Sequence, residues 1–247
     1  MTPLASFSDN MRVIVIGATG GIGRAFIESL AAHDRVTDVY ALSRTGAVPR
    51  GDKIKPLTFD FSDVETIKAG AEVLRETGKF DLIIVATGLL HGNGISPEKS
   101  TRDLSHDAFA KSFAANVAGP ALTAKYFLPL LKRDGKTVFT ALSARVGSIS
   151  DNRMGGWYAY RAAKAALNMV LKNLSIEHGR RFKESIIVGL HPGTVDTDLS
   201  KPFQGNVPDG KLFTAEYSAA HLLDVIDGLT VEDTGDLFAW DGQRIAF

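Results

Sequence analysis

"RVIVIGATGGIGRAF" (residues 12–26) decides the fold of this chain. A short β-branched, apolar run ends in a turn with four glycines, and a segment of helical period follows at once. Glycines at such a turn let the backbone approach a pyrophosphate, and the helix N-terminus offers it free N–H groups. The turn therefore predicts a dinucleotide site, although its spacing differs from the commoner Gly-x-Gly-x-x-Gly. The residues expected to bind there are Gly17, Thr19, Gly21, Ile22 and Gly23.

The rest of the chain alternates strand-like runs with amphipathic segments. The strand-like runs are almost continuously apolar, which is typical of parallel strands covered on both faces. They lie at 12–17, 39–43, 55–59, 81–86, 136–142, 185–190 and 236–240, and helical segments lie at 21–33, 63–76, 107–132 and 215–228. We therefore expect a single α/β domain over residues 1–247. Its core would be a Rossmann-like, doubly wound parallel sheet of about seven strands with helices on both faces.

Composition excludes several classes of function. The 28 basic residues balance the 28 acidic ones, so no bulk charge attracts nucleic acid. The chain has no cysteine, and its six histidines show no ligand spacing, so we expect no metal site and no thiolate chemistry. No apolar run approaches the roughly 18 residues of a membrane span, and the N-terminus does not resemble a signal peptide. These features predict a cytoplasmic protein that binds no membrane.

The end of the second predicted strand indicates which dinucleotide is bound. An acidic side chain there would accept hydrogen bonds from the ribose hydroxyls of NAD. The sequence "ALSRTG" (41–46) instead offers Ser43 and Arg44 and no carboxylate. Arginine would pair with the 2′-phosphate of NADP(H), which is therefore the expected cofactor. The alternative is an arginine that is simply solvated in a surface loop.

Tyr160 and Lys164 lie four residues apart in "GGWYAYRAAKAALNMV" (155–170), so both leave the same face of a helix. Tyrosine normally titrates near 10, and a neighbouring ammonium stabilises the phenolate and lowers its pKa. The pair is therefore a candidate acid–base couple for delivering a proton to a developing alkoxide. The alternative is a helix end at which the lysine extends to water.

Together these motifs resemble the short-chain dehydrogenase/reductase family over almost the whole chain. The glycine turn is followed in the family's order by "FDFSD" (59–63), "AANVAGP" (114–120), "YRAAK" (160–164) and "HPGTVDT" (191–197). The strings "GSISDN" (147–152), "GGWYAYR" (155–161) and "FAWDG" (238–242) look most like the bacterial C-factor-like carbonyl reductase branch. The resemblance implies a carbonyl or alcohol substrate of small size.

The resemblance also implies roles for individual residues. Tyr160 would be the proton donor, Lys164 would tune it and hydrogen-bond the nicotinamide ribose, and Asn116 would hold a water that links Lys164 to solvent. Asn116 could otherwise be a structural amide bonded to backbone. Further cofactor contacts are expected from Asp60 and Phe61 at the adenine and from Pro192, Gly193, Val195 and Thr197 at the nicotinamide.

Two positions depart from the family pattern. The usual Asn-Ala-Gly after the fourth strand is Ala86-Thr87-Gly88 here, and these three residues are still expected to line the cofactor site. The serine that orients the substrate carbonyl normally stands three residues before Gly147, where this chain has an alanine. We expect the adjacent Ser143 to take that role and regard Ser148 as the second candidate.

The sequence thus predicts an NADP(H)-dependent oxidoreductase that reduces a ketone or aldehyde, or oxidises the matching alcohol. A glycine- and proline-rich segment, 198–213, is expected to form a mobile substrate lid. Apolar residues around the helix of Tyr160, and in 108–131, predict a homodimer or homotetramer. Two alternatives stay open: an NADP-binding sensor or cell-signalling protein with little turnover, and, less favoured, a nucleotide-sugar epimerase.

Overall fold

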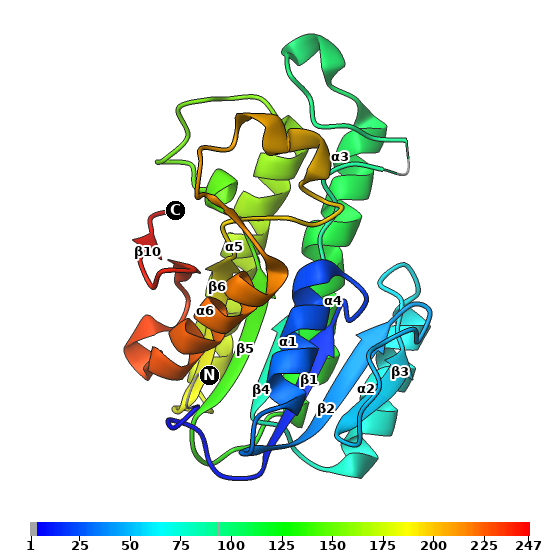
Figure 1. The fold of residues 1–247 in the computed structure, drawn as a ribbon, viewed down its shortest axis with the longest axis vertical. Helices are drawn as coiled ribbons and strands as arrows, with labels where there is room; N and C mark the ends of the chain where they lie inside the picture. The colour runs from blue at the N-terminus through cyan, green and yellow to red at the C-terminus, as the bar shows by residue number, and fades with distance from the viewer. Residues whose placement is uncertain (1–3, 93) are drawn as a thin grey trace.

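The computed structural model describes residues 4–92 and 94–247, and an eight-stranded sheet forms its centre (Figure 1). The strands are β1 (Met11–Ile16), β2 (Val36–Ser43), β3 (Ile54–Thr58), β4 (Leu82–Val85), β5 (Thr137–Leu142), β6 (Ser185–His191), β9 (Leu237–Ala239) and β10 (Arg244–Ile245). Across the sheet their order is β10-β9-β6-β5-β4-β1-β2-β3. Seven strands are parallel and correspond to the seven predicted runs, while the short β10 pairs antiparallel with β9.

Helices cover both faces of the sheet, as the sequence predicts. One face carries α1 (Gly21–Ala31) and α6 (Ala215–Gly228), and the other carries α2 (Val64–Thr77), α4 (Gly119–Phe127) and α5 (Tyr158–Gly179) (Figure 1). Outside the main sheet, β7 (Thr194–Val195) pairs with β8 (Leu212–Phe213), and these two strands bracket the short helix η5 (Lys201–Asn206). None of the helices in the described part of the chain is long and apolar enough to cross a membrane.

The predicted continuous helix over 107–132 is wrong in detail. The segment consists of α3 (His106–Phe113), a π-helical turn η2 (Ala114–Ala118), α4 and a 3₁₀ turn η3 (Leu128–Leu130). Pro120 has no N–H to donate to the carbonyl of Asn116 four residues earlier, so the regular α-helical ladder cannot continue there. The π turn takes up this break, with the N–H of Gly119 donating to the carbonyl of Ala114. Such turns are often found at functional sites.

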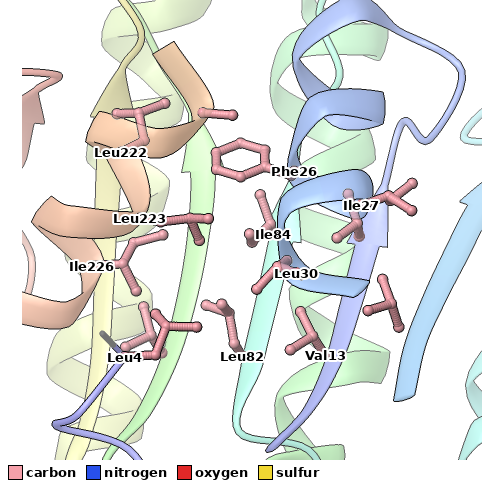
Figure 2. Close-up of a cluster of buried hydrophobic side chains, with 14 of the residues drawn as sticks. Leu4, Val13, Phe26, Ile27, Leu30, Leu82, Ile84, Leu222, Leu223 and Ile226 are labelled. Carbon is pink, nitrogen blue, oxygen red and sulfur yellow. The ribbon is translucent and has the colours of Figure 1, made fainter. Parts of the chain in front are cut away.

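A dense apolar core between the sheet, α1 and α6 fixes the position of the glycine turn. Figure 2 shows the α1 side chains Phe26 and Leu30 facing Leu222 and Ile226 of α6, with the β4 side chain Ile84 between Phe26 and Leu30. Full burial of side chains of this size stabilises the fold by about 1.5–3 kcal/mol each. Because the apolar side of α1 is held in this way, the first turn of the helix stays at the carboxyl end of β1.

Candidate active site

The site lies at the carboxyl ends of the neighbouring parallel strands β1 and β4, where the order in which the chain adds strands to the sheet reverses. On one side of β1 the sheet continues with β2 and β3. On the other side it continues with β4, β5 and β6. Ligands of open α/β sheets bind in the crevice that such a reversal leaves. Most of the predicted motifs follow the carboxyl ends of β1, β2, β3, β4, β5 and β6 or open α5, and the motif of Asn116 lies in the π turn η2. Topology therefore gathers segments that lie far apart in the sequence.

Close backbone contact explains the glycines of the turn. Gly17 has a φ of +91°, and a Cβ atom there would lie 2.7 Å from the carbonyl oxygen of Ala86. A Cβ on Gly23 would collide with the carbonyl oxygen of Gly17. The residue before α1, Gly20, provides no capping side chain, so the first N–H groups of α1 remain available to an anion. This narrow backbone cradle, with Thr19 exposed at its rim, fits a pyrophosphate.

The end of β2 presents a cation beside a carboxylate. Arg44 is exposed, and the hydroxyl of Ser43 accepts a hydrogen bond from the N–H of Gly46 over 3.0 Å. Asp60 accepts hydrogen bonds from the N–H and hydroxyl of Ser62, and these bonds, with a contribution from the nearby guanidinium of Arg44, lower its pKa. Arg44 and Asp60 thus occupy the same end of the crevice, where a dinucleotide would place its adenosine half.

Phe61 differs from its neighbour Asp60 in direction. Its ring lies against Gly119, where an added Cβ would come within 2.7 Å of the ring, and contacts Phe59 at a centroid distance of 5.2 Å. The ring is therefore packed against the start of α4. The part of Phe61 that stays exposed, together with its backbone, is available for the adenine contact that the family resemblance implies.

Tyr160 and Lys164 are both buried on one side of α5, with 9% and 2% of their surfaces exposed. The Nζ of Lys164 donates a hydrogen bond to the carbonyl oxygen of Leu142 over 2.8 Å and lies 5.6 Å from the Tyr160 ring centroid. Lys164 therefore does not extend to water. Burial lowers the pKa of Lys164 to about 7 and raises the pKa of Tyr160. The expected lowering of the Tyr160 pKa by Lys164 is not found, because burial of the phenol dominates.

Asn116 ties three elements together beside Lys164. It is fully buried: its Oδ1 accepts from the N–H of Leu89 over 3.0 Å, and its Nδ2 donates to the carbonyl of Leu89 and the hydroxyl of Ser112 over 2.8 and 3.2 Å. A Cβ on Gly88 would lie 3.5 Å from Oδ1 of Asn116 and 3.8 Å from Nζ of Lys164. The side chain thus holds the backbone of the loop after β4. Its own backbone carbonyl receives no hydrogen bond from residue 120, because Pro120 has no N–H.

Ser143 is turned toward the lower part of α5. Its hydroxyl donates to Oδ1 of Asn168 over 2.6 Å, and both residues are buried. Asn168 lies eight residues beyond Tyr160, which is about 12 Å along the helix axis. In this arrangement the single hydrogen of the Ser143 hydroxyl points to Asn168 and away from the first turns of α5.

Ser148 lies nearer the first turns of α5. The preceding residue, Gly147, is packed so tightly that an added Cβ would lie 2.8 Å from Lys164. The hydroxyl of Ser148 accepts a hydrogen bond from the N–H of Asp151 over 3.1 Å and lies 3.4 Å from the hydroxyl of Ser150. Either Ser148 or Ser150 can be the donor between these two hydroxyls, so the hydrogen of Ser148 can also be donated to another acceptor.

The segment after β6 lies against the glycine turn and is the part of the crevice for which the sequence predicts nicotinamide contacts. Gly193 has a φ of +78°, and a Cβ there would lie 2.6 Å from the ring of Phe213. Pro192 accepts a hydrogen bond from the hydroxyl of Ser218 over 2.8 Å, and Val195 is buried. The methyl group of Thr197 would lie 2.7 Å from a Cβ on Gly21. The structure thus brings the Pro-Gly segment against the glycine turn, as a shared cofactor site requires.

Thr87, one of the two departures from the family pattern, packs its methyl group against Gly17. Its hydroxyl is buried and has no hydrogen-bond partner among the described residues. An unsatisfied buried hydroxyl is costly, and here it lies at the edge of the pyrophosphate cradle. This orphaned group is a second feature, besides the glycines, that fits a polar ligand in the crevice.

Aromatic side chains cover Tyr160 from the outside. The Trp157 ring lies 6.3 Å from the Tyr160 ring and 5.1 Å from the ring of Phe203 in η5. His91 contacts Phe203 at 5.7 Å, and its Nε2 lies 3.0 Å from the carbonyl oxygen of Asp198. The predicted lid segment is therefore seated over α5 in this structure. Its mobility stays a prediction.

Sequence reasoning missed several residues of the site. Asn168 continues the spacing of Tyr160 and Lys164 by one more helical turn, so the pattern at 160, 164 and 168 could have revealed it. Glu98 is 97% buried although it lies in a polar loop, and no periodic pattern predicts that.

The chain belongs to the short-chain dehydrogenase/reductase family of oxidoreductases. The family model described as short chain dehydrogenase matches residues 11–207. A 1-hydroxy-2-glutathionyl-2-methyl-3-butene dehydrogenase of Rhodococcus sp. (strain AD45) is 33% identical over 234 residues, which cover 93% of this chain and 96% of that protein. The C-signal protein of Myxococcus xanthus is 34% identical over 143 residues, or 58% of this chain and 81% of that protein, which confirms the expected likeness to the C-factor branch.

Solved structures of carbonyl reductases share the fold. The NADPH-bound carbonyl reductase from chicken fatty liver has a TM-score of 0.84 and 25% identity, and the match covers 100% of this chain and 99% of that one. The carbonyl reductase Sniffer of D. melanogaster has a TM-score of 0.83 over 97% of this chain and 100% of its own, at 20% identity. The predicted Rossmann-like architecture is confirmed by these likenesses.

Proposed function

We propose that this protein uses NADPH to reduce the carbonyl group of a ketone or aldehyde, or uses NADP to oxidise the matching alcohol. One observation carries the proposal: Tyr160 and Lys164 are buried on one side of α5, and Lys164 lies beside Gly88 in the loop after β4, whose Ala86 and Thr87 pack against Gly17 of the glycine turn. A buried phenol and a buried ammonium are costly to keep, and their pairing at a nucleotide crevice is what acid–base chemistry on a bound carbonyl needs.

The crevice has residues to hold each part of NADP(H). The glycine turn would bind the pyrophosphate, Arg44 and Ser43 the 2′-phosphate, and Asp60 the adenine. The nicotinamide half would be held by Lys164 at its ribose and by the segment from Pro192 to Thr197. When bound, the cofactor supplies the hydride for the carbonyl carbon.

The residues of the chain would manage the proton. Tyr160 donates its phenolic proton to the oxygen that becomes an alkoxide, and the high pKa that burial gives this phenol keeps it protonated until then. The ammonium of Lys164 stabilises the phenolate that remains. The backbone carbonyl of Asn116 holds the water through which the proton is replaced. Because Lys164 has a pKa of about 7, its charge, and with it this stabilisation, would weaken as the pH rises above 7.

The position of Ser143 supports moving the carbonyl-orienting role to Ser148. Ser143 already donates its hydrogen to Asn168, whereas the Ser148 hydroxyl is free to turn toward a ligand near the first turns of α5. This revises the choice made from the sequence. The lid segment 198–213 would enclose the substrate. The cytoplasmic location of the protein stays a prediction from its sequence.

A sensor or signalling protein with little turnover is the second candidate function. The likeness to the Myxococcus xanthus C-signal favours it, as does the alanine at the family's serine position. It predicts NADPH binding without NADPH oxidation in the presence of any carbonyl compound. The intact set of Tyr160, Lys164 and Asn116 makes the enzyme the better proposal.

Replacing Tyr160 with Phe should nearly abolish carbonyl reduction and leave NADPH binding almost unchanged. The ring still packs in the core, and only the proton donor is lost, which costs about 10²–10⁴-fold for a general acid. Steady-state turnover and fluorescence titration with NADPH would measure the two effects. A variant that keeps more than about a tenth of wild-type turnover would remove Tyr160 from the proposed role.

Replacing Arg44 with Ala should weaken NADPH binding by about tenfold or more and leave NADH binding unchanged, because a charge-assisted bond to the 2′-phosphate is lost. Titration with both cofactors measures this. The exposed Arg50, six residues further on, is a matched control whose substitution by Ala should affect neither cofactor. Equal losses for NADPH and NADH in the Arg44 variant would assign this arginine a different part.

Replacing Ser148 with Ala should lower kcat by about 10- to 1,000-fold, the scale of losing one hydrogen bond in the transition state. Replacing Ser143 with Ala should change kcat far less, because that hydroxyl serves Asn168. Turnover at saturating NADPH compares the two variants directly. The opposite ranking would return the role to Ser143, and wild-type turnover in both would favour the sensor.

We further propose that the chain forms a homodimer, or a homotetramer that contains it, through α4 and α5. Met169 and Ile176 on α5 leave 62% and 52% of their surfaces exposed, and small residues such as Ala121 line the groove between the two helices. A two-fold axis there would bury both apolar side chains. Sedimentation at micromolar concentration should give at least twice the chain mass of 26.5 kDa, and a clean monomer would contradict this.

A further inference from the structure

The helix that carries Tyr160 has no capping side chain of its own. Its N-cap residue is Trp157, which adopts a left-handed conformation with a φ of +50° and makes no side-chain hydrogen bond to the first turn. Gly155 and Gly156 also have positive φ, so three successive left-handed residues lead into α5. A bulky residue in this region is strained and persists only where its surroundings hold it. Something outside α5 must therefore hold this turn.

Glu98, from the loop after β4, supplies the missing cap. Its Oε2 accepts a hydrogen bond from the N–H of Ala159 over 3.2 Å, and its backbone carbonyl accepts from the N–H of Trp157 over 2.6 Å. Two of the first N–H groups of α5 are thus satisfied by one residue 61 positions away in the sequence. The negative carboxylate also lies at the positive end of the helix dipole.

The same turn is held from two further sides. The hydroxyl of Ser112 donates to the carbonyl of Ala159 over 3.3 Å, so the residue before Tyr160 is held at its N–H by one loop and at its carbonyl by another helix. The guanidinium of Arg161 donates to the carbonyls of Gly155 and Gly156, each over 3.1 Å. These bonds fix the backbone on both sides of Tyr160.

Glu98 is an expensive way to cap a helix. It exposes only 3% of its surface, and its Oε1 is buried with no hydrogen-bond partner among the described residues. A buried oxygen left without a hydrogen bond is unfavourable, whereas an exposed serine or aspartate at the N-cap would provide the same bond without that penalty. What Glu98 adds over such a cap is a fixed position of the first turn of α5 relative to the loop after β4, because its carboxylate reaches the turn from that separate loop.

We propose that Glu98 is a positioning residue for Tyr160. Its carboxylate and carbonyl lock the left-handed turn and the first turn of α5, and so set the place of the phenol relative to a substrate carbonyl. This inference rests on the proposed function. It adds that the loop after β4, which contributes no reacting group, controls the geometry of proton transfer.

Two substitutions at Glu98 and one control test this positioning. Glu98→Ala removes the acceptor, Glu98→Gln keeps the length of the side chain and an acceptor oxygen, and Asp103→Ala loosens the same loop without touching α5. Asp103 is exposed and caps the loop by accepting from the N–H groups of Lys99 and Ser100. All three variants are compared in kcat, in KM for NADPH and in amide hydrogen exchange.

Glu98→Ala should lower kcat by about 10- to 100-fold, since a small misplacement of a reacting group has effects of that size, and leave KM for NADPH within about threefold. Glu98→Gln should recover most of the lost kcat. Asp103→Ala should keep wild-type kcat. A purely structural role of Glu98 would instead lower kcat and NADPH affinity together, or lower kcat equally in the Asp103 variant. Either result would overturn the proposal. A wild-type kcat in Glu98→Ala would overturn it as well.

Hydrogen exchange separates this inference from the proposed function. In Glu98→Ala the amides of residues 158–160 should exchange faster than in the wild type, and in Asp103→Ala they should not. If the wild type binds NADPH but reduces no carbonyl, the proposed function fails, and exchange alone then decides whether Glu98 holds this turn. Unchanged exchange in Glu98→Ala would overturn the positioning role whatever the activity.

Discussion

The hydrogen bond from Lys164 to the carbonyl of Leu142 is the contact on which the site depends. It joins the second turn of α5 to the carboxyl end of β5. Lys164, which carries the ammonium group, exposes only 2% of its surface. Burial of this charge is unfavourable and lowers the pKa of Lys164 to about 7. The fold tolerates it because α5 is packed along its inner face, with Leu167 and Leu171 fully in the core. Once Lys164 is fixed, Tyr160 one turn earlier faces the same crevice.

The loops that follow β1 and β4 are closely packed beside Lys164. Gly17 and Gly23 bring the turn after β1 so close to neighbouring backbone that no side chain would fit, and Asn116 uses its whole amide to hold the loop after β4. The crevice is thus shaped by main chain more than by side chains. Side chains of the lid and of the loops around Trp157 and Phe203 form its outer wall, and there the substrate preference would be decided.

Local pattern made much of this predictable, and long-range contacts account for the rest. Continuous apolar runs predicted the seven parallel strands, and the spacing of four residues predicted that Tyr160 and Lys164 share a face. The π turn at Asn116 is not predictable from the sequence pattern. Pro120 indicates a break in the helix, but it does not indicate whether the helix kinks, ends or forms a π turn. Adjacency to the family's serine position favours Ser143, and adjacency alone does not give the direction of a hydroxyl, which here points to Asn168. The burial of Glu98 depends on a contact across 61 residues, which no local window contains.

The central claim is that the chain transfers hydride from NADPH to a carbonyl carbon while its own side chains supply the proton. The most direct measurement uses NADPH with deuterium at both C4 positions of the nicotinamide, purified protein and a panel of ketones and aldehydes, with mass analysis of the alcohols formed. We expect NADPH to be consumed in equal amount to the alcohol, with one deuterium on the former carbonyl carbon. NADPH that binds tightly but is not consumed with any member of the panel would contradict the account.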